Sequence, residues 1–148
     1  GIDLNNAYNG LKNFRGVLRR LEEKGTFKGI TILDDFAHHP TAIKSTMNAV
    51  KEKYCDKNIL NIIELGSNTM SGGFHGDDLS IIDNLDYDIH WLDHKSVLKN
   101  NKNNIYSSHK ELIKSISKIY SDFDIILIMT NKNSKYIFEP IKEIIEIS

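Results

Sequence analysis

The sequence predicts one α/β domain with a mostly parallel sheet and helices on both of its faces. The first observation is alternation, because short apolar runs are followed by longer segments whose apolar residues recur at helical spacing. The second is the length of 148 residues, which suits a single domain. The third is the composition, since 40% hydrophobic and 26% charged residues are the proportions of an ordinary globular chain.

The first half of the chain predicts a hairpin between two helices. Two short runs flank Gly25 and Gly29, and the second is rich in β-branched residues, which favours paired strands joined by a turn. Such a hairpin adds an antiparallel pair at one edge of the sheet. Pro40 then suits a first helical turn, where a missing N–H is tolerated, and Thr41 suits a hydroxyl cap. The predicted elements are a helix over residues 4–13, a hairpin contained within 18–35 and a helix over 39–54.

The second half predicts strands in alternation with helices. Residues 58–64 and 123–129 are almost wholly apolar, as strands covered on both faces are. Pro140 is expected in the first turn of the last helix. The predicted elements are strands over 58–64, 86–92 and 123–129, and helices over 75–85, 108–120 and 139–148.

In a parallel sheet of this kind, ligands bind beyond the carboxyl ends of the strands. The segments that follow the predicted strands are therefore the candidates for a functional site. They are Asp34–Pro40, Glu64–Phe74, Trp91–Lys95 and Thr130–Tyr136.

The polar segment Asp34–Pro40 (DDFAHHP) lies between a strand and a helix start. The carboxylates of Asp34 and Asp35 can accept ribose hydroxyls or hold a cation, and the imidazoles of His38 and His39 can donate to anionic groups. The structural alternative is a helix cap with solvated histidines. A metal site is disfavoured, because the side chains of adjacent histidines diverge.

A second polar segment follows the strand over 58–64. Ser67, Asn68 and Thr69 offer hydrogen-bond donors, and the glycines around them allow close approach of a ligand to the backbone. A plain polar turn explains the segment equally well.

The third candidate is Arg19-Arg20, just before the hairpin. A guanidinium group suits a phosphate or carboxylate, so one of these side chains could hold a nucleotide phosphate. The alternative is a surface pair balanced by Glu22 and Glu23.

Charge and sequence motifs exclude several classes of protein. With 19 basic and 20 acidic residues, the net charge of −1 gives no general attraction to nucleic acid or anionic membranes. No apolar run approaches the roughly 18 residues of a membrane span. Cys55 is the only cysteine, which excludes an internal disulfide and favours a cytoplasmic setting. The phosphate-binding motif G-x-x-x-x-G-K-[ST] is absent from the chain.

Together these segments resemble one family. Phe14–Glu22 (FRGVLRRLE) and Asp34–Ile43 (DDFAHHPTAI) are similar to the C-terminal domain of the Mur ligases. Two acidic residues, an aromatic, a small residue and HHPT are typical of the branch that ligates onto UDP-N-acetylmuramate. Ser67–Met70 (SNTM) resembles the murein peptide ligases of this family rather than the L-alanine-adding ones. The resemblance covers essentially the whole chain.

This resemblance implies the third, Rossmann-like domain of a three-domain ligase. Such an enzyme uses ATP and magnesium to join L-alanyl-γ-D-glutamyl-meso-diaminopimelate to UDP-N-acetylmuramate through an acyl phosphate. The N-terminal domain would bind the UDP-sugar, and the central domain would carry the phosphate loop and hold most of the magnesium. Residues 1–148 would be one domain of that longer chain.

The resemblance also implies roles for individual residues. Arg20 would reach the ATP phosphates and Asp35 would bind the ribose. His38 and His39, together with the loop Ser67–Thr69, would face the incoming peptide. It assigns no catalytic residue and no metal ligand to this chain.

Two segments depart from the family pattern. Leu65-Gly66 stand where the family has Pro-Arg, so a guanidinium for the peptide carboxylate is missing. Thr130–Tyr136 (TNKNSKY) replaces a glycine-rich Ser-Asn-Gly-Gly-Phe-Gly-Gly run.

The same residues are also compatible with three other functions. The nearest is the C-terminal domain of the UDP-N-acetylmuramate–L-alanine ligase. The others are a non-catalytic nucleotide-binding module and a metal-dependent phosphoesterase. The phosphoesterase would use Asp34, Asp35, His38, His39 and His75.

Overall fold

The computed structural model describes residues 19–66, 79, 82, 86–98 and 104–148. Its strands are β1 (Glu22–Phe27), β2 (Ile30–Asp35), β3 (Ile59–Glu64), β4 (Asp88–Leu92), β5 (Ile105–Tyr106) and β6 (Ile125–Met129). They form one sheet in the order β1-β2-β6-β3-β4-β5. Only the β1–β2 pair of this described sheet is antiparallel, which confirms the predicted mixed sheet with a hairpin at its edge.

The hairpin turns at Lys28 and Gly29. Both residues have positive φ, 46° and 88°, as the tight two-residue turn between strands of normal twist requires. Gly25 does not lie in the turn. It lies within β1, at a shift in strand register, with φ of 143°. The predicted pair of strands is confirmed, and the two glycines serve different purposes in it.

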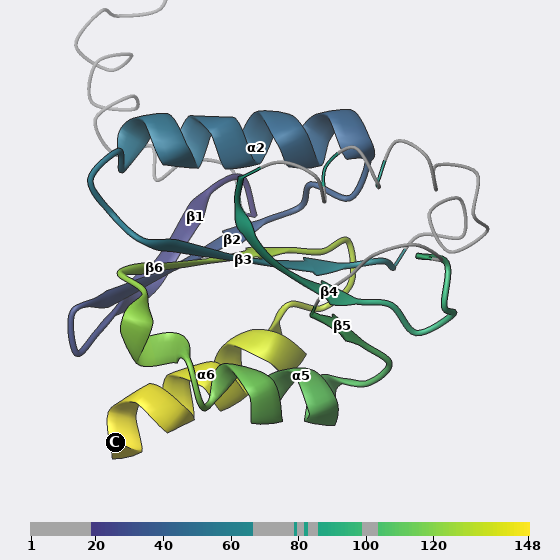
Figure 1. Ribbon diagram of the computed structural model, residues 1–148. Helices are drawn as coiled ribbons and strands as arrows, with labels where there is room; N and C mark the ends of the chain where they lie inside the picture. The colour runs from purple at the N-terminus through teal and green to yellow at the C-terminus, as the bar shows by residue number, and fades with distance from the viewer. Residues whose placement is uncertain (1–18, 67–78, 80–81, 83–85, 99–103) are drawn as a thin grey trace, which may run out of the picture.

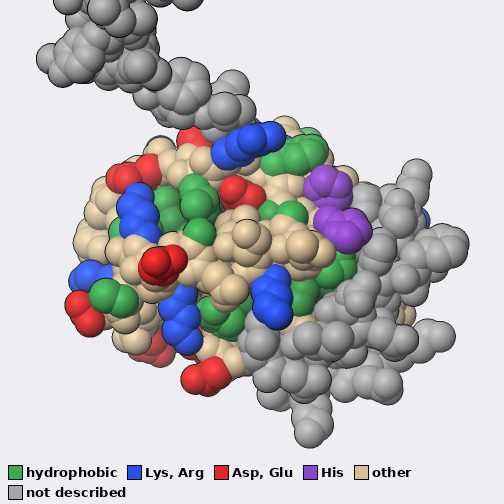
Figure 2. Space-filling view, turned by 90° about the horizontal axis from the view of Figure 1, so that it is seen from above, with side chains coloured by type: hydrophobic (Ala, Val, Ile, Leu, Met, Phe, Trp, Pro, Cys, Tyr) green, Lys and Arg blue, Asp and Glu red, His purple; other side chains and the backbone are tan. Residues whose placement is uncertain are grey.

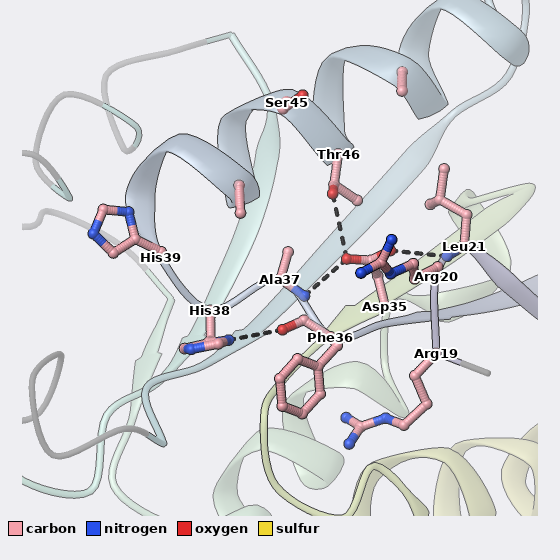
Figure 3. Close-up of a pocket in the computed structure, with 12 residues that line it drawn as sticks. Arg19, Arg20, Leu21, Asp35, Phe36, Ala37, His38, His39, Ser45 and Thr46 are labelled. Atoms are coloured by element: carbon pink, nitrogen blue, oxygen red, sulfur yellow. Dashed lines mark hydrogen bonds between the residues drawn. The ribbon is translucent and has the colours of Figure 1, made fainter. Parts of the chain in front are cut away.

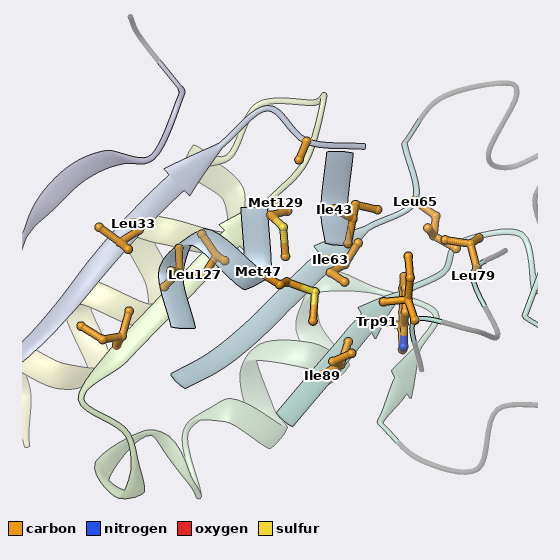
Figure 4. Packing of buried hydrophobic residues seen from close by; sticks show 14 residues of the cluster. Leu33, Ile43, Met47, Ile63, Leu65, Leu79, Ile89, Trp91, Leu127 and Met129 are labelled. Carbon is orange, nitrogen blue, oxygen red and sulfur yellow. The ribbon is translucent and has the colours of Figure 1, made fainter. Parts of the chain in front are cut away.

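Helices cover both faces of the sheet, as predicted (Figure 1). The helix α2 (Pro40–Lys53) lies on one face, and α5 (His109–Ile116) and α6 (Lys135–Ile147) lie on the other. Neighbouring strand residues alternate between these layers, so Leu33 packs in the α2 cluster and Ile32 in the α5–α6 cluster. The α2 cluster has a tight apolar interior built by residues of α2, β3, β4 and β6 (Figure 4).

The last helix begins earlier than predicted. The prediction began this helix at residue 139 with Pro140 in its first turn, but α6 begins at Lys135 and contains Pro140. Its extra turn buries Ile137 and Phe138 against the sheet. Burying these two side chains outweighs the one helical hydrogen bond that a proline removes.

Other boundaries also differ from the prediction. The helix predicted over 108–120 ends at Ile116, and a 3-10 turn follows at Tyr120–Asp122. The short strand β5 was not predicted. Thr41 does not cap α2, because His39 holds the N-cap position and makes no side-chain cap bond.

The predicted helix 4–13 lies outside the described residues. Only Leu79 and Ile82 of the helix predicted over 75–85 are described as helical, and both are buried. Within the described residues, no helix is long and apolar enough to cross a membrane. The face covered by α2 carries mixed acidic, basic and histidine side chains rather than a field of one sign (Figure 2).

The parallel strands bring their carboxyl ends to one edge of the sheet. Asp35 pairs in register with Met129, Met129 pairs with Ile63, and Glu64 pairs with Leu92. The segments after β2, β3, β4 and β6 therefore begin side by side, as the sequence predicted. The part of the second segment at residues 67–74 lies outside the described residues.

Candidate functional site

The turn that precedes β1 holds Arg20 between two residues of unusual backbone. Arg19 and Leu21 have φ of 57° and 47°, in the left-handed region that side chains disfavour. The end of β2 holds this turn in place. The Phe36 N–H donates to the Arg19 carbonyl over 2.8 Å, and the Leu21 N–H donates to Asp35 Oδ2 over 2.8 Å. Such fixed strain is typical of functional sites.

Asp35 is the side chain that ties the turn, β2 and α2 together (Figure 3). Its Oδ1 accepts from the Ala37 N–H at 2.8 Å and from the Thr46 hydroxyl at 3.3 Å, while Oδ2 accepts from Leu21. The residue is only 8% exposed. Because a carboxylate has about four acceptor positions, the described residues leave one on Oδ2 for a further donor.

The Arg19 side chain interacts with groups inside the protein. Its Nε lies 3.4 Å from Asp34 Oδ2, its guanidinium donates to the Thr130 carbonyl, and its charge lies 5.1 Å from the centre of the Phe36 ring. Asp34 is 1% exposed and also accepts from the Ser134 hydroxyl at 2.6 Å. The pair therefore fastens β2 to the segments around β6 and α6.

Asp34 and Asp35 point to opposite faces of β2, as neighbouring strand residues do. Asp34 contacts Ser134 at the start of α6, whereas Asp35 contacts Thr46 of α2. Two carboxylates on opposite faces cannot bind one ion, so the phosphoesterase interpretation is wrong for this pair. His75, its remaining candidate ligand, lies outside the described residues.

Arg20 differs from its neighbour in exposure and in contacts. It is exposed, and within the described part of the chain it makes no hydrogen bond or ion pair. It lines a hollow of about 480 Å³ together with Asp35, Phe36 and His38. Among the described residues, Arg20 forms no ion pair with Glu22 or Glu23, the predicted acidic partners of the arginine pair. Instead, the Arg19 N–H and then the Lys24 ammonium hold the pKa of Glu22 below its usual value.

His38 and His39 lie at the mouth of the same hollow. The His38 ring is 2.9 Å from the Phe36 carbonyl through Nδ1, and its edge packs on the Phe36 ring with centres 5.1 Å apart. His39 is exposed at the N-terminus of α2. The structure thus gathers Arg20, Asp35 and both histidines around one surface hollow.

A second polar cluster lies at the ends of β3 and β4. Glu64 is 1% exposed and accepts from the Thr130 hydroxyl at 2.7 Å. Its other oxygen, Oε1, lies 3.1 Å from His94 Nε2, 3.4 Å from His109 Nε2 and 3.5 Å from Lys132 Nζ. Burial lowers the pKa of His109, although the nearby Glu64 carboxylate opposes this effect.

His94, His109 and Lys132 were not among the individual site residues predicted from the sequence. His94 lies in Trp91–Lys95, one of the segments that follow predicted strands, so the topology contained a signal for it. His109 is brought here by the unpredicted strand β5, which ends just before α5. No sequence signal links it to Glu64.

The two departures from the family pattern touch each other. A Cβ atom placed on Gly66 would lie 2.4 Å from Asn131 Oδ1 and 2.9 Å from Lys132 Cγ. The Lys132 stem therefore fills the space that a side chain at position 66 needs, and an arginine could not be added there without moving it. The neighbouring candidates Ser67, Asn68 and Thr69 lie outside the described residues.

Comparison with known proteins decides the family. Residues 19–132 match the family described as "Mur ligase, glutamate ligase domain". The chain belongs to the Mur ligase family. The resemblance found in the sequence is thereby confirmed.

Two curated Mur ligases show how the match is distributed. The UDP-N-acetylmuramate–L-alanyl-γ-D-glutamyl-meso-2,6-diaminoheptandioate ligase of Haemophilus influenzae is 43% identical over 81 residues, which are 54% of this chain and 18% of that one. The UDP-N-acetylmuramate–L-alanine ligase of Clostridium kluyveri is 49% identical over 63 residues, 43% of this chain and 14% of that one. The chain thus spans less than a fifth of these relatives.

Solved Mur ligases match over nearly the whole chain. A murein peptide ligase from Psychrobacter arcticus has a TM-score of 0.75 and 32% identity, and the match covers 99% of this chain and 34% of that one. The UDP-N-acetylmuramate–alanine ligase of Thermotoga maritima has a TM-score of 0.67 over 97% of this chain and 33% of its own, but 22% identity, which supports the fold alone.

Proposed function

We propose that this chain is the C-terminal domain of an ATP-dependent ligase that joins L-alanyl-γ-D-glutamyl-meso-diaminopimelate to UDP-N-acetylmuramate. The observation that carries the proposal is the 99% coverage at 32% identity with a murein peptide ligase. The N-terminal and central domains of the same longer chain would complete the enzyme. A cytoplasmic setting, where these soluble substrates occur, belongs to the same proposal.

The hollow beside Arg20 is proposed as this domain's half of the ATP site. An exposed guanidinium fits a phosphate, and the remaining acceptor position on Asp35 fits a ribose hydroxyl. ATP would supply the phosphoryl group that activates the acceptor carboxylate. Magnesium does not fit the described part of this hollow, because Asp35 is held by neutral donors, so the central domain is assigned most of its ligands.

The peptide is proposed to lie at the same edge of the sheet. His38 and His39 would face it from the start of α2, and Ser67, Asn68 and Thr69 would do so from the segment after β3. We assign the peptide carboxylate to the Lys132 ammonium, because its stem fills the space beside Gly66 where the family carries a guanidinium. The side chain is 44% exposed and so can reach a ligand.

The L-alanine ligase is the second candidate, favoured by the 49% identity over 63 residues with the Clostridium kluyveri enzyme. A competition assay separates the two. The full-length protein that carries this chain is incubated with ATP, magnesium, UDP-N-acetylmuramate and equimolar tripeptide and L-alanine, and the products are identified by mass spectrometry.

We expect the tripeptide adduct to predominate. An L-alanine adduct alone would replace the first candidate with the second. Formation of neither adduct by a folded full-length protein would contradict both and favour a non-catalytic nucleotide-binding module.

A further inference from the structure

The residues of the cluster around Glu64 are not among those that line the hollow beside Arg20, and none of them is assigned to the nucleotide. Its members come from three segments: the end of β3 supplies Glu64, the loop after β4 supplies His94, and the first residue of α5 is His109. Each offers one metal-ligating atom, and these atoms all lie within 4.8 Å of one another.

The two distances from Glu64 match those between the ligands of a small divalent ion. A tetrahedral zinc site with bonds of about 2.0–2.1 Å has ligand–ligand separations of about 3.3 Å. Glu64 Oε1 lies 3.1 Å from His94 Nε2 and 3.4 Å from His109 Nε2. We propose that Glu64, His94 and His109 form a three-ligand site for a divalent transition metal of the zinc type.

The surrounding bonds already orient these side chains as ligands. His94 Nδ1 lies 3.0 Å from the Ser107 carbonyl, which only accepts, so Nδ1 carries a ring proton. Nε2 points at Glu64 Oε1 from 3.1 Å and donates to it in the metal-free chain, and a bound metal would take the place of that Nε2 proton. The Thr130 hydroxyl donates to Glu64 Oε2, while Oε1 is the oxygen that faces the two histidines. Backbone and hydroxyl partners of this kind fix the ligands of known metal sites.

His109 gives an independent observation. Its Nε2 atom is buried and has no hydrogen-bond partner among the described residues, although it lies 3.4 Å from a carboxylate oxygen. In a neutral ring protonated on Nδ1, the Nε2 lone pair of His109 faces Glu64 Oε1, so two electron-rich atoms face each other. A bound cation between them removes that repulsion and satisfies all three atoms at once.

Lys132 provides a way to separate a metal site from an ion-pair cluster. Its Nζ is 3.5 Å from Glu64 Oε1, and the side chain is 44% exposed, so it can move out to solvent. The ammonium competes with a metal for the same oxygen. If the cluster binds metal, substitution of Lys132 strengthens metal binding. If the cluster is only a set of ion pairs, the same substitution creates no metal site.

The test uses zinc and cobalt ions as probes on the metal-stripped 148-residue chain. The exposed thiol of Cys55 is first removed by Cys55→Ser, so that it does not bind zinc itself. Titration calorimetry with Zn²⁺ gives stoichiometry and affinity, and the visible spectrum of bound Co²⁺ reports coordination by its intensity. Circular dichroism verifies the fold of every variant.

We expect one zinc ion per chain and an intense four-coordinate cobalt spectrum. His94→Ala and His109→Ala should each weaken zinc binding at least about ten-fold, Lys132→Met should tighten it, and the matched control His38→Ala should leave it unchanged. Both ligand histidines are partly exposed, so these variants are expected to fold.

Zinc binding that survives both histidine substitutions would overturn the proposal. A folded chain that binds no zinc would overturn it as well, and so would weaker binding by Lys132→Met. None of these results depends on ligase activity, so failure of the metal proposal would leave the proposed function untouched, and the reverse also holds.

Discussion

Adjacent arginines with the same chemistry have opposite environments at this site. Arg19 is held by Asp34, the Thr130 carbonyl and the Phe36 ring, whereas Arg20 is exposed beside a hollow. The left-handed turn separates the two side chains. At the scale of single residues, this predicts that one arginine serves stability and the other serves binding.

Arg19→Ala is expected to destabilise the chain. Its loss leaves Asp34, 1% exposed, with the Ser134 hydroxyl as its only described partner. The expected loss of unfolding free energy is about 2 kcal/mol, below the range for a fully buried pair because Arg19 is partly exposed. Urea unfolding measures it, with Arg20→Ala as the matched control. Equal effects of the two substitutions would contradict the division of roles.

Asp35→Asn is expected to lower the stability of the fold and to loosen the turn that holds Arg20 beside the hollow. An amide has one acceptor oxygen, so its NH₂ group must face either the Leu21 or the Ala37 N–H. The expected loss is about 1–3 kcal/mol of unfolding free energy. In the full-length enzyme the KM for ATP should rise.

Thr46→Val removes only the longest of the three bonds to Asp35 and is the control for that substitution. It should change stability and the KM for ATP less than Asp35→Asn does. An Asp35→Asn variant with unchanged stability would show that the carboxylate does not fasten the turn.

At the scale of elements, strand β4, which lies between β3 and β5, carries a buried titratable side chain. His90 is 4% exposed, stacks on Tyr106 of β5 at 5.7 Å and hydrogen-bonds its hydroxyl through Nδ1 at 3.0 Å. Burial lowers the pKa of His90 from 6.5 to about 4. The folded state therefore holds this ring neutral at pH 7.

This burial predicts a loss of stability in mild acid. Between pH 6.5 and about 4 the unfolded chain takes up a proton at His90 that the folded chain does not, so stability falls as the pH falls. From pH 7 to pH 5 the unfolding free energy should drop about 2 kcal/mol more in the native sequence than in His90→Phe. Urea unfolding at both pH values measures the difference. Parallel curves would contradict a buried neutral ring.

The predictable elements are those whose local pattern and burial agree. The strands β3 and β6 are mostly apolar and buried, and α2 has a clear apolar stripe, so the sequence located them within one or two residues. β5 has only two residues and pairs through tertiary contact with β4, so no pattern indicated it. The start of α6 was missed because Pro140 was read as a start signal.

At the scale of the whole molecule, this chain is expected to bind one side of the nucleotide and to catalyse nothing alone. Half of a site between domains neither excludes water nor orients the reacting carboxylate. The purified chain should release no phosphate from ATP above background in a colorimetric assay. Magnesium-dependent release by the pure chain, with a heat-denatured sample as control, would contradict this expectation.

The site was predictable only where one short segment contains it. Asp35, His38 and His39 follow one strand, and Arg20 precedes the hairpin that pairs with it, so motif and topology indicated them together. The cluster of Glu64, His94 and His109 joins three segments up to 45 residues apart, and only the folded sheet brings it together. Distance along the chain therefore limited the prediction.

The most direct test of this account is the turnover of Arg20→Ala in the full-length enzyme. A charge-assisted bond to a transferring phosphate contributes about 3 kcal/mol, so kcat should fall about 100-fold while the melting temperature stays within about 1 °C. Lys44→Ala, an exposed cation of α2 away from the hollow, should change neither quantity. Unchanged turnover, or turnover lost together with folding, would contradict the assignment of this hollow to the nucleotide.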